Sequence, residues 1–303
     1  VDLPFIGKTM NCGNISSAVG PFAIDEGLVE AVEPITVVRI FNTNTNKMII
    51  AHVPVQDGKA MTEGDFHIDG VPGNAARIRL EFENPQGSVS GKLLPTGNPK
   101  DTIEIAGKTY EYSFVDAANP VVFVRAEQLG LTGVELPGEF EARPDAKEIC
   151  RILEVIRGTC AITIGLASGL EDAAINSQTL PKILYCTEPK DYISGSGQGI
   201  GKEDVDYVGR MFSLGMKMIQ AYMGTGSICT IVAANTPGTI VNDILCKNGT
   251  DNKVKKMRIG HPLGIMEVEA KLADIAGGGH TVVSGILGRT ARRIMDGYVY
   301  VRD

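Results

Sequence analysis

Twice in this chain, a turn of small and polar residues leads into a helix that is apolar on most of its faces. The first case is residues 11–24 (NCGNISSAVGPFAI), and the second is residues 225–234 (TGSICTIVAA). A helix with apolar side chains all round cannot lie on a surface and must be surrounded by other elements. A curled sheet wrapped around each helix meets that requirement. Both helix N-termini then face one cleft.

Strand-like runs surround both of these helices. Residues 36–41 (TVVRIF) and 48–53 (MIIAHV) flank the polar turn 42–47 (NTNTNK), which is the pattern of a β-hairpin. We therefore expect an α+β fold of two domains, residues 1–143 and 144–303, that meet in a turn-rich spacer. The remaining patterns predict strands at 77–82, 110–115, 121–124, 160–165, 255–259, 265–272 and 298–301, and helices at 16–32, 146–157, 203–222 and 290–295.

Composition excludes several classes of partner. The 303 residues carry a net charge of −7 and no basic run, so neither nucleic acid nor an anionic membrane surface is an expected partner. The six cysteines have no paired spacing, which predicts free thiols in a reducing cytoplasm and no metal site. No signal peptide or long apolar run is present. The glycine-rich loop at 194–201 (SGSGQGIG) lacks phosphate-loop spacing, so no nucleotide cofactor is expected.

Cys12 lies between Asn11 and Gly13 at the start of the first apolar helix. Unpaired backbone N–H groups and the helix dipole favour negative charge at such a position. The position can therefore hold a carboxylate or stabilise a thiolate that acts as an acid or a base. The alternative is a small buried residue that fills a tight turn. Local sequence leaves both readings open.

Two further groups are candidates for anion binding. Thr225, Gly226 and Ser227 open the second apolar helix, where their N–H groups and hydroxyls can bind a carboxylate. The same residues are also typical of an ordinary N-cap. His261 lies in a turn between two predicted strands, where it either contacts an anion or is a structural histidine.

Taken together, several segments in order along the chain resemble the methylaconitate/methylitaconate isomerase family, whose fold is that of diaminopimelate epimerase. The most specific segment is 11–24, and the resemblance extends over essentially the whole chain. The supporting segments are 91–98 (GKLLPTGN), 116–120 (DAANP), 225–227 (TGS), 260–262 (GHP), 290–293 (TARR) and 297–301 (GYVYV).

The resemblance implies two pseudo-symmetric domains, each a mixed sheet or barrel wrapped around a central helix, with the site in the cleft between them. It also implies cofactor-free transfer of a proton and a double bond within an unsaturated di- or tricarboxylate. The sequence does not set the oligomeric state, and a homo-oligomer is one possibility. Cys12 is then the catalytic residue. The implied substrate-binding residues are Asn11, Gly13, Asn14, Ser16, Thr225, Gly226, Ser227 and His261.

Thr225 distinguishes this chain from the epimerases of the same fold, which resemble it but open the second helix with another cysteine. One thiol opposite one hydroxyl favours a 1,3-shift, which a base on one face can complete, over two-base racemisation. The resemblance also implies a lysine base upstream of the cysteine motif. Lys8 is not in that context, so we expect a chain that lacks the first part of its N-terminal domain. A truncated homologue that binds carboxylates without turnover, and a tautomerase of an oxalomesaconate-type substrate, are the alternatives.

Overall fold

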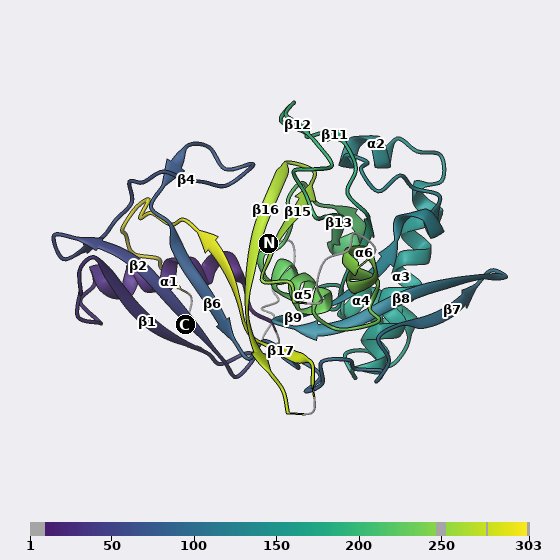
Figure 1. The fold of residues 1–303 in the computed structure, drawn as a ribbon, viewed down its shortest axis with the longest axis horizontal. Helices are drawn as coiled ribbons and strands as arrows, with labels where there is room; N and C mark the ends of the chain where they lie inside the picture. Colours follow the sequence, from purple (N-terminus) through teal and green to yellow (C-terminus); the bar gives the residue numbers. More distant parts are fainter. Residues whose placement is uncertain (1–9, 247–252, 277, 302–303) are drawn as a thin grey trace.

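The computed structural model of this chain describes residues 10–246, 253–276 and 278–301. Lys8 therefore lies outside the described residues. Six α-helices and seventeen strands are formed in these ranges (Figure 1). The helices are α1 (Gly13–Asp25), α2 (Pro137–Glu141), α3 (Ala146–Thr163), α4 (Leu170–Asn176), α5 (Gly224–Ala234) and α6 (Ile240–Cys246). Two 3₁₀ turns are η1 (Ala126–Leu129) and η2 (Leu214–Met216).

The strands fall into one large sheet and two short ribbons. Those of the first half are β1 (Ile35–Asn42), β2 (Lys47–Gln56), β3 (Lys59–Ala60), β4 (Phe66–His67), β5 (Asn74–Ala75), β6 (Ile78–Glu83), β7 (Asp101–Ile105), β8 (Lys108–Ala117) and β9 (Asn119–Arg125). Those of the second half are β10 (Lys182–Thr187), β11 (Tyr192–Ile193), β12 (Gly199–Ile200), β13 (Tyr207–Ser213), β14 (Lys217–Met218), β15 (Lys256–His261), β16 (Gly264–Asp274) and β17 (His280–Arg289).

The large sheet runs through both halves of the chain. In the described residues it has 13 strands, with the order β1-β2-β6-β17-β16-β15-β13-β10-β9-β8-β7 and with β3 and β14 at its margins. β9 and β10 pair in parallel, as do β13 and β15. β17 lies between β6 and β16, so strands from both sides of residue 143 are interleaved. The division into domains 1–143 and 144–303 stays a prediction.

The two apolar helices lie against different parts of this sheet (Figure 1). Every residue of α5 is buried, as expected for a surrounded helix. α1 packs on β1 and β2 through one face, where Gly20 lies so close that a Cβ would be 2.7 Å from Val53 Cγ2. Its opposite face differs from the expectation, because Ile15 is 69% exposed and Phe22 is 55% exposed.

Several predicted elements are confirmed. The hairpin is β1 and β2, paired from Ile35↔Pro54 to Asn42↔Lys47. The predicted strands at 77–82, 110–115, 121–124, 255–259 and 265–272 correspond to β6, β8, β9, β15 and β16, although those at 77–82 and 255–259 begin one residue before β6 and β15. The helix predicted at 146–157 is α3, which continues to Thr163. The first helix ends earlier than predicted, at Asp25.

Other predictions of secondary structure are wrong. Residues 160–165 are not a strand, because Cys160 continues the buried stripe of α3 begun by Ile149, Leu153 and Ile156 at helical spacing. Residues 203–222 are not a helix but contain β13 and β14. β13 is an interior strand that is buried on both faces, so it lacks the alternation that marks a half-exposed strand. Residues 290–301 have no regular structure.

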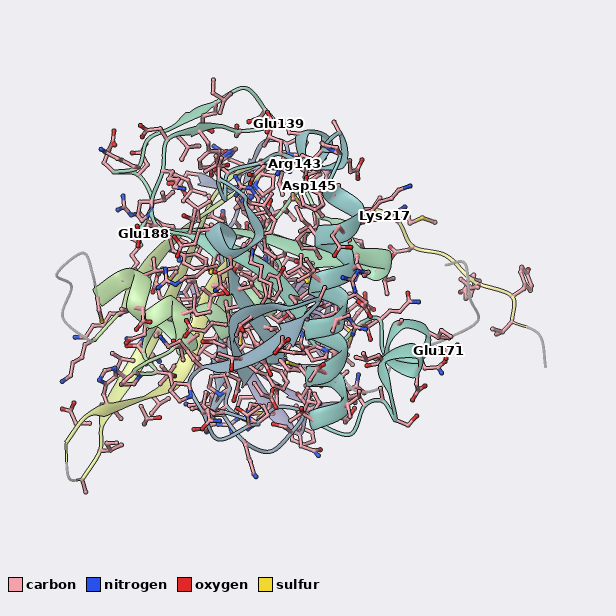
Figure 2. The ribbon with its side chains drawn as sticks, turned by 90° about the vertical axis from the view of Figure 1, so that its right-hand side faces the viewer. Glu139, Arg143, Asp145, Glu171, Glu188 and Lys217 are labelled. Carbon is pink, nitrogen blue, oxygen red and sulfur yellow. The ribbon has the colours of Figure 1, made fainter. Side chains whose placement is uncertain are left out.

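The segment at the predicted spacer is folded against the sheet. Phe140 of α2 packs edge-on against Phe212 of β13, with ring centroids 5.4 Å apart. Arg143 and Asp145, at the start of α3, form an ion pair of 2.8 Å and lie together in Figure 2. No helix in the described ranges combines the length and the apolar character that crossing a bilayer requires.

Candidate active site

The starts of α1 and α5 meet through a single buried side chain. Asn119, the first residue of β9, donates from Nδ2 to the carbonyl of Asn11 at 3.1 Å and to Thr225 Oγ1 at 2.7 Å. A Cβ on Gly13 would lie 3.6 Å from the backbone nitrogen of Thr225. The two helix N-termini therefore lie close together. That both of them face one cleft stays a prediction.

In α1 and α5, no side chain at the N-cap or in the first turn neutralises the partial positive charge of the helix N-terminus. The N-cap residues Cys12 and Met223 make no side-chain capping bond, and neither helix has an acidic residue in its first turn. The first helical hydrogen bonds run from Ser16 N–H to the carbonyl of Cys12 and from Ser227 N–H to the carbonyl of Met223. The N–H groups before Ser16 and Ser227 have no acceptor within their helices, which makes the two helix starts a candidate site for an anion.

Cys12 is exposed beside this junction. It lines an open cleft of 1160 Å³. The exposure rules out the alternative of a small buried residue filling a turn. A thiol at a helix N-terminus that opens into a cleft can exchange a proton with a bound molecule. The other lining residues include Ile15 and Val19 of α1, Phe41 and Asn44 of the β1–β2 hairpin, and Lys217 of β14.

Asn11 carries a buried donor without an acceptor. Its Oδ1 accepts from Ser16 Oγ at 3.1 Å and from Asn42 Nδ2 at 2.5 Å. The side chain of Asn42 is oriented by the N–H groups of Asn44 and Thr45, which donate to its Oδ1. This arrangement leaves Asn11 Nδ2 buried and without an acceptor among the described residues. Buried donors are nearly always satisfied in proteins, so this amide is a candidate ligand for a substrate oxygen.

The hydroxyls of the two predicted serines bond within the helix starts, although Ser16 also lines the cleft beside Cys12. Ser16 Oγ donates within α1, to Asn11 Oδ1 and to the carbonyl of Cys12 at 3.0 Å. Ser227 Oγ donates to the carbonyl of Gly224 at 2.8 Å and is fully buried. Both hydroxyls therefore organise the helix starts. Direct substrate contact by Ser16 and Ser227 stays a prediction.

The other predicted residues are close to the same junction. Asn14 is exposed in the first turn of α1. Thr225 Oγ1 accepts from Asn119 and keeps its own proton available for donation. Gly226 leaves room for Met211, since a Cβ there would lie 2.8 Å from Met211 Cε.

His261 is buried at the end of β15, and its Nδ1 accepts the N–H of Leu263 at 3.2 Å. The pKa of His261 is lowered to about 4, mainly by burial, with Arg210 and Arg289 acting in the same direction and Asp69 and the backbone of Gln220 opposing them. The ring is therefore neutral at neutral pH. It cannot supply positive charge for a carboxylate, although it can still donate a hydrogen bond.

Asn42 is not among the predicted site residues, and Asn119 is suggested by the sequence only as a residue that either caps a turn or bonds to substrate. The only signal for Asn42 is its place in a polar hairpin turn, and the signal for Asn119 is the segment 116–120, which resembles the family. Within the described ranges, no group of three or more histidine, cysteine and acidic side chains is placed to hold a metal ion.

Comparison with known proteins identifies the family. The model of the PrpF protein family matches residues 1–302. The chain belongs to the PrpF family. This membership confirms the predicted resemblance, and the α+β fold class is confirmed as well.

Proteins similar to this chain include several that are named as isomerases. Over 292 residues the chain is 44% identical to 3-methylitaconate isomerase of Eubacterium barkeri, covering 96% of this chain and 74% of that protein. Over 309 residues it is 38% identical to 2-methyl-aconitate isomerase of Shewanella oneidensis, covering 99% of this chain and 75% of that protein. The crystal structure of methylitaconate-delta-isomerase superposes with a TM-score of 0.82 at 43% identity, covering 96% of this chain and 72% of that chain.

Proposed function

We propose that this chain is a cofactor-independent isomerase that moves a proton and a double bond within an unsaturated di- or tricarboxylate such as 2-methylaconitate or 3-methylitaconate. The observation that carries the proposal is the meeting of two unneutralised helix N-termini beside the exposed thiol of Cys12. The relatives named as isomerases of such carboxylates support the substrate class.

The chemistry demands a site that stabilises negative charge. A base removes a proton from the carbon next to the carboxylate-bearing double bond, and the electron pair spreads over the allyl system and its carboxylate. A proton then returns to the far end of that system, so the product is an isomer and no electron acceptor is needed. In this proposal the unpaired N–H groups at the starts of α1 and α5 stabilise the dienolate charge.

Cys12 is the group that we assign to proton exchange with the substrate carbon. Thr225 lies on the facing helix, where it bonds with Asn119 and offers a hydroxyl instead of a second thiol. A single thiol supports a shift along one face of the substrate rather than inversion by two bases. This asymmetry favours the isomerase over a racemase.

Replacing Cys12 tests the proposal. In heavy water, the wild-type chain should shift the double bond of 2-methylaconitate or 3-methylitaconate and incorporate deuterium, both followed by proton NMR. Cys12→Ala should lower the rate by roughly 10²-fold to 10⁴-fold, the usual contribution of a positioned acid or base. Cys150→Ser is the matched control, because that thiol lies on α3 and contacts the carbonyl of Met216.

The outcomes separate the candidate functions. No shift and no deuterium incorporation by the wild type with either substrate would overturn the isomerase proposal. Binding without exchange would instead support a non-catalytic carboxylate-binding homologue, and turnover of oxalomesaconate alone would support a tautomerase. We further propose a cytoplasmic location, supported by cysteines without paired spacing. A homo-oligomeric state is a prediction that sedimentation tests directly.

A further inference from the structure

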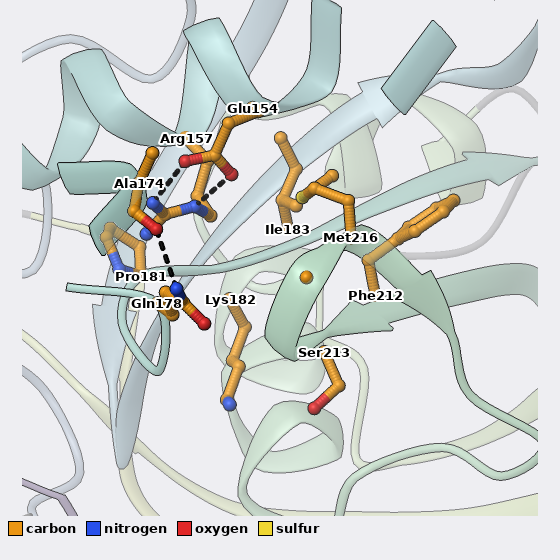
Figure 3. A pocket seen from close by; sticks show the side chains of 11 residues that line it. Glu154, Arg157, Ala174, Gln178, Pro181, Lys182, Ile183, Phe212, Ser213 and Met216 are labelled. Atoms are coloured by element: carbon orange, nitrogen blue, oxygen red, sulfur yellow. Dashed lines mark hydrogen bonds and ion pairs between the residues drawn. The ribbon is translucent and has the colours of Figure 1, made fainter. Parts of the chain in front are cut away.

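Three arginines are buried in the described part of the chain, and two of them are fully supplied with acceptors. Arg157 on α3 is 3% exposed and pairs with both oxygens of Glu154, as Figure 3 shows, while its remaining N–H groups donate to three carbonyls. Arg210 on β13 is fully buried and donates to four backbone carbonyls. These two side chains are structural, because burial of a guanidinium is tolerated when its donors are satisfied.

The third buried arginine, Arg289, is different. It is the last residue of β17 and is 8% exposed. Its Nη1 donates to the carbonyl of the neighbouring Gly288 at 2.9 Å, and its Nη2 lies 3.9 Å from the sulfur of Met266. Among the described residues, no carboxylate forms an ion pair with Arg289. Most of its N–H groups therefore lack an acceptor there, and its positive charge lacks a counter-charge.

The fold places this charge at the start of α5. The strand β17 runs along α5 toward the N-terminus of the helix, with a Cβ on Gly285 reaching Ile228 at 2.6 Å and a Cβ on Gly224 reaching Arg289 Nη2 at 2.6 Å. The guanidinium therefore lies against the first residue of the helix. Positive charge is favoured at the opposite end of a helix, so the dipole repels Arg289.

Burial does not remove the charge. It lowers the pKa of Arg289 to about 10, which leaves the guanidinium protonated at neutral pH. The site therefore combines a desolvated cation, the positive end of a helix and first-turn N–H groups without helical acceptors. Each of these features is costly without an anion and favourable with one.

We propose that Arg289 binds one carboxylate of the substrate together with the first N–H groups of α5. The proposal rests on the proposed function, which it deepens by naming a residue that determines specificity. A planar guanidinium can bind both oxygens of a carboxylate, which fixes its orientation. The unpaired Asn11 Nδ2 at the start of α1 then serves a second carboxylate, so the site selects molecules with at least two.

Binding of an unreactive analogue tests the proposal independently of turnover. Propane-1,2,3-tricarboxylate is saturated and cannot isomerise, and its affinity for the wild-type chain is measured by calorimetry. Arg289→Met should weaken this affinity, and raise KM for 2-methylaconitate, by roughly 10-fold to 100-fold, the range for lost charge-assisted hydrogen bonds. Arg292→Met is the control, because that arginine is exposed in the same segment.

Thermal unfolding separates ligand binding from a structural role. If Arg289 serves a ligand, the ligand-free Arg289→Met protein should melt at the wild-type temperature or above it, because an unpaired buried charge has been removed. The tricarboxylate should raise the melting temperature of the wild type and of Arg292→Met but not of Arg289→Met. A ligand-free variant that melts at a clearly lower temperature, with unchanged affinity, would overturn the proposal.

Arg289→Lys keeps the charge and covers the case in which Arg289→Met fails to fold. It should bind the tricarboxylate about tenfold more weakly, since an ammonium cannot engage both oxygens in one plane. An unchanged affinity in Arg289→Lys, or no binding by the wild type, would also overturn the proposal. Wild-type binding that is lost in the variants, without isomerisation by any of them, would refute the proposed function and leave the carboxylate site intact.

Discussion

At the scale of single residues, the candidate site is organised by amides rather than by charged groups. Asn119 donates to the start of each apolar helix, and Asn42 orients Asn11. The donors that remain unpaired, on Asn11 and Arg289, are the ones that a carboxylate would satisfy. Side chains whose hydrogen bonds are all made fix the positions of the two helix starts. Side chains with unpaired donors are available to bind a ligand.

His261 should make stability depend on pH. Its pKa is lowered from 6.5 to about 4 in the folded chain, so the unfolded chain binds the proton more readily between these values. The free energy of unfolding should therefore fall as the pH falls through this window. The loss due to His261 should be on the order of 3 kcal/mol at pH 4 relative to pH 7.

Urea unfolding of the wild type and of His261→Gln at pH 7 and at pH 4.5 measures this effect. The variant should lose less stability than the wild type between the two pH values, whatever its stability at pH 7. Equal losses in the two proteins would show that His261 is protonated in the folded state.

At the scale of elements, α1 and α5 have similar sequences and different surroundings. α5 is enclosed on every side, while α1 contacts β1 and β2 through a face of small residues. Gly20 is the closest point of this contact, since a Cβ there would lie 2.7 Å from Val53 Cγ2 and 3.2 Å from Ala51 Cβ. The close approach of α1 to the sheet is therefore possible because Gly20 has no Cβ.

Gly20→Ala should destabilise the protein although alanine is the better helix former. The gain in helix propensity is about 1 kcal/mol, whereas overpacking against β2 costs about 1–3 kcal/mol and shifts the start of α1. Gly138→Ala in α2 is the control, because a Cβ there meets no atom within 4 Å. Chemical unfolding should show a loss for Gly20→Ala and no loss for Gly138→Ala. Equal stabilisation of both would contradict the close packing of α1.

At the scale of the whole molecule, a buried carboxylate joins neighbouring strands of the large sheet. Glu81 of β6 accepts from Ser284 Oγ of β17 at 2.7 Å and from Lys271 Nζ of β16 at 2.7 Å. Arg79 lies 3.3 Å from the same carboxylate, and His52 of β2 lies 3.7 Å from it. Glu81 therefore connects strands from both halves of the chain at the position where β17 enters the sheet.

Glu81→Gln should lower the free energy of unfolding by about 2 kcal/mol, because it removes the acceptor charge while leaving Lys271 and Arg79 in place. Glu267→Gln is the matched control. Glu267 pairs with Lys256 on the sheet surface, with both side chains about half exposed, and such pairs contribute about 0–1 kcal/mol. Denaturant titration compares the two. A larger loss in the control would show that the buried network is not important for joining the strands.

Local patterns were enough to predict much of the fold. The hairpin β1–β2, the strand β6 and the helix α3 follow from period-2 or helical spacing in the sequence. The prediction failed at β13, because a strand buried on both faces has no alternation, and Arg210 interrupts its apolar run. It failed again at residues 160–165, where β-branched residues end a helix.

The sequence by itself determined that two apolar helices begin in small polar turns, that Cys12 opens one of them, and that Thr225 opens the other. These features depend on neighbouring residues, whose spacing is visible in the chain. Only the tertiary structure decided that Asn119 joins the two helix starts and that Arg289 lies against Gly224. Those contacts link residues that are 65 or more positions apart, and the packing of α5 against α1, β9 and β17 brings them together. Arg289 differs from Arg210 in whether its N–H donors have hydrogen-bond acceptors. That difference depends on the folded structure, because the acceptors come from distant parts of the chain.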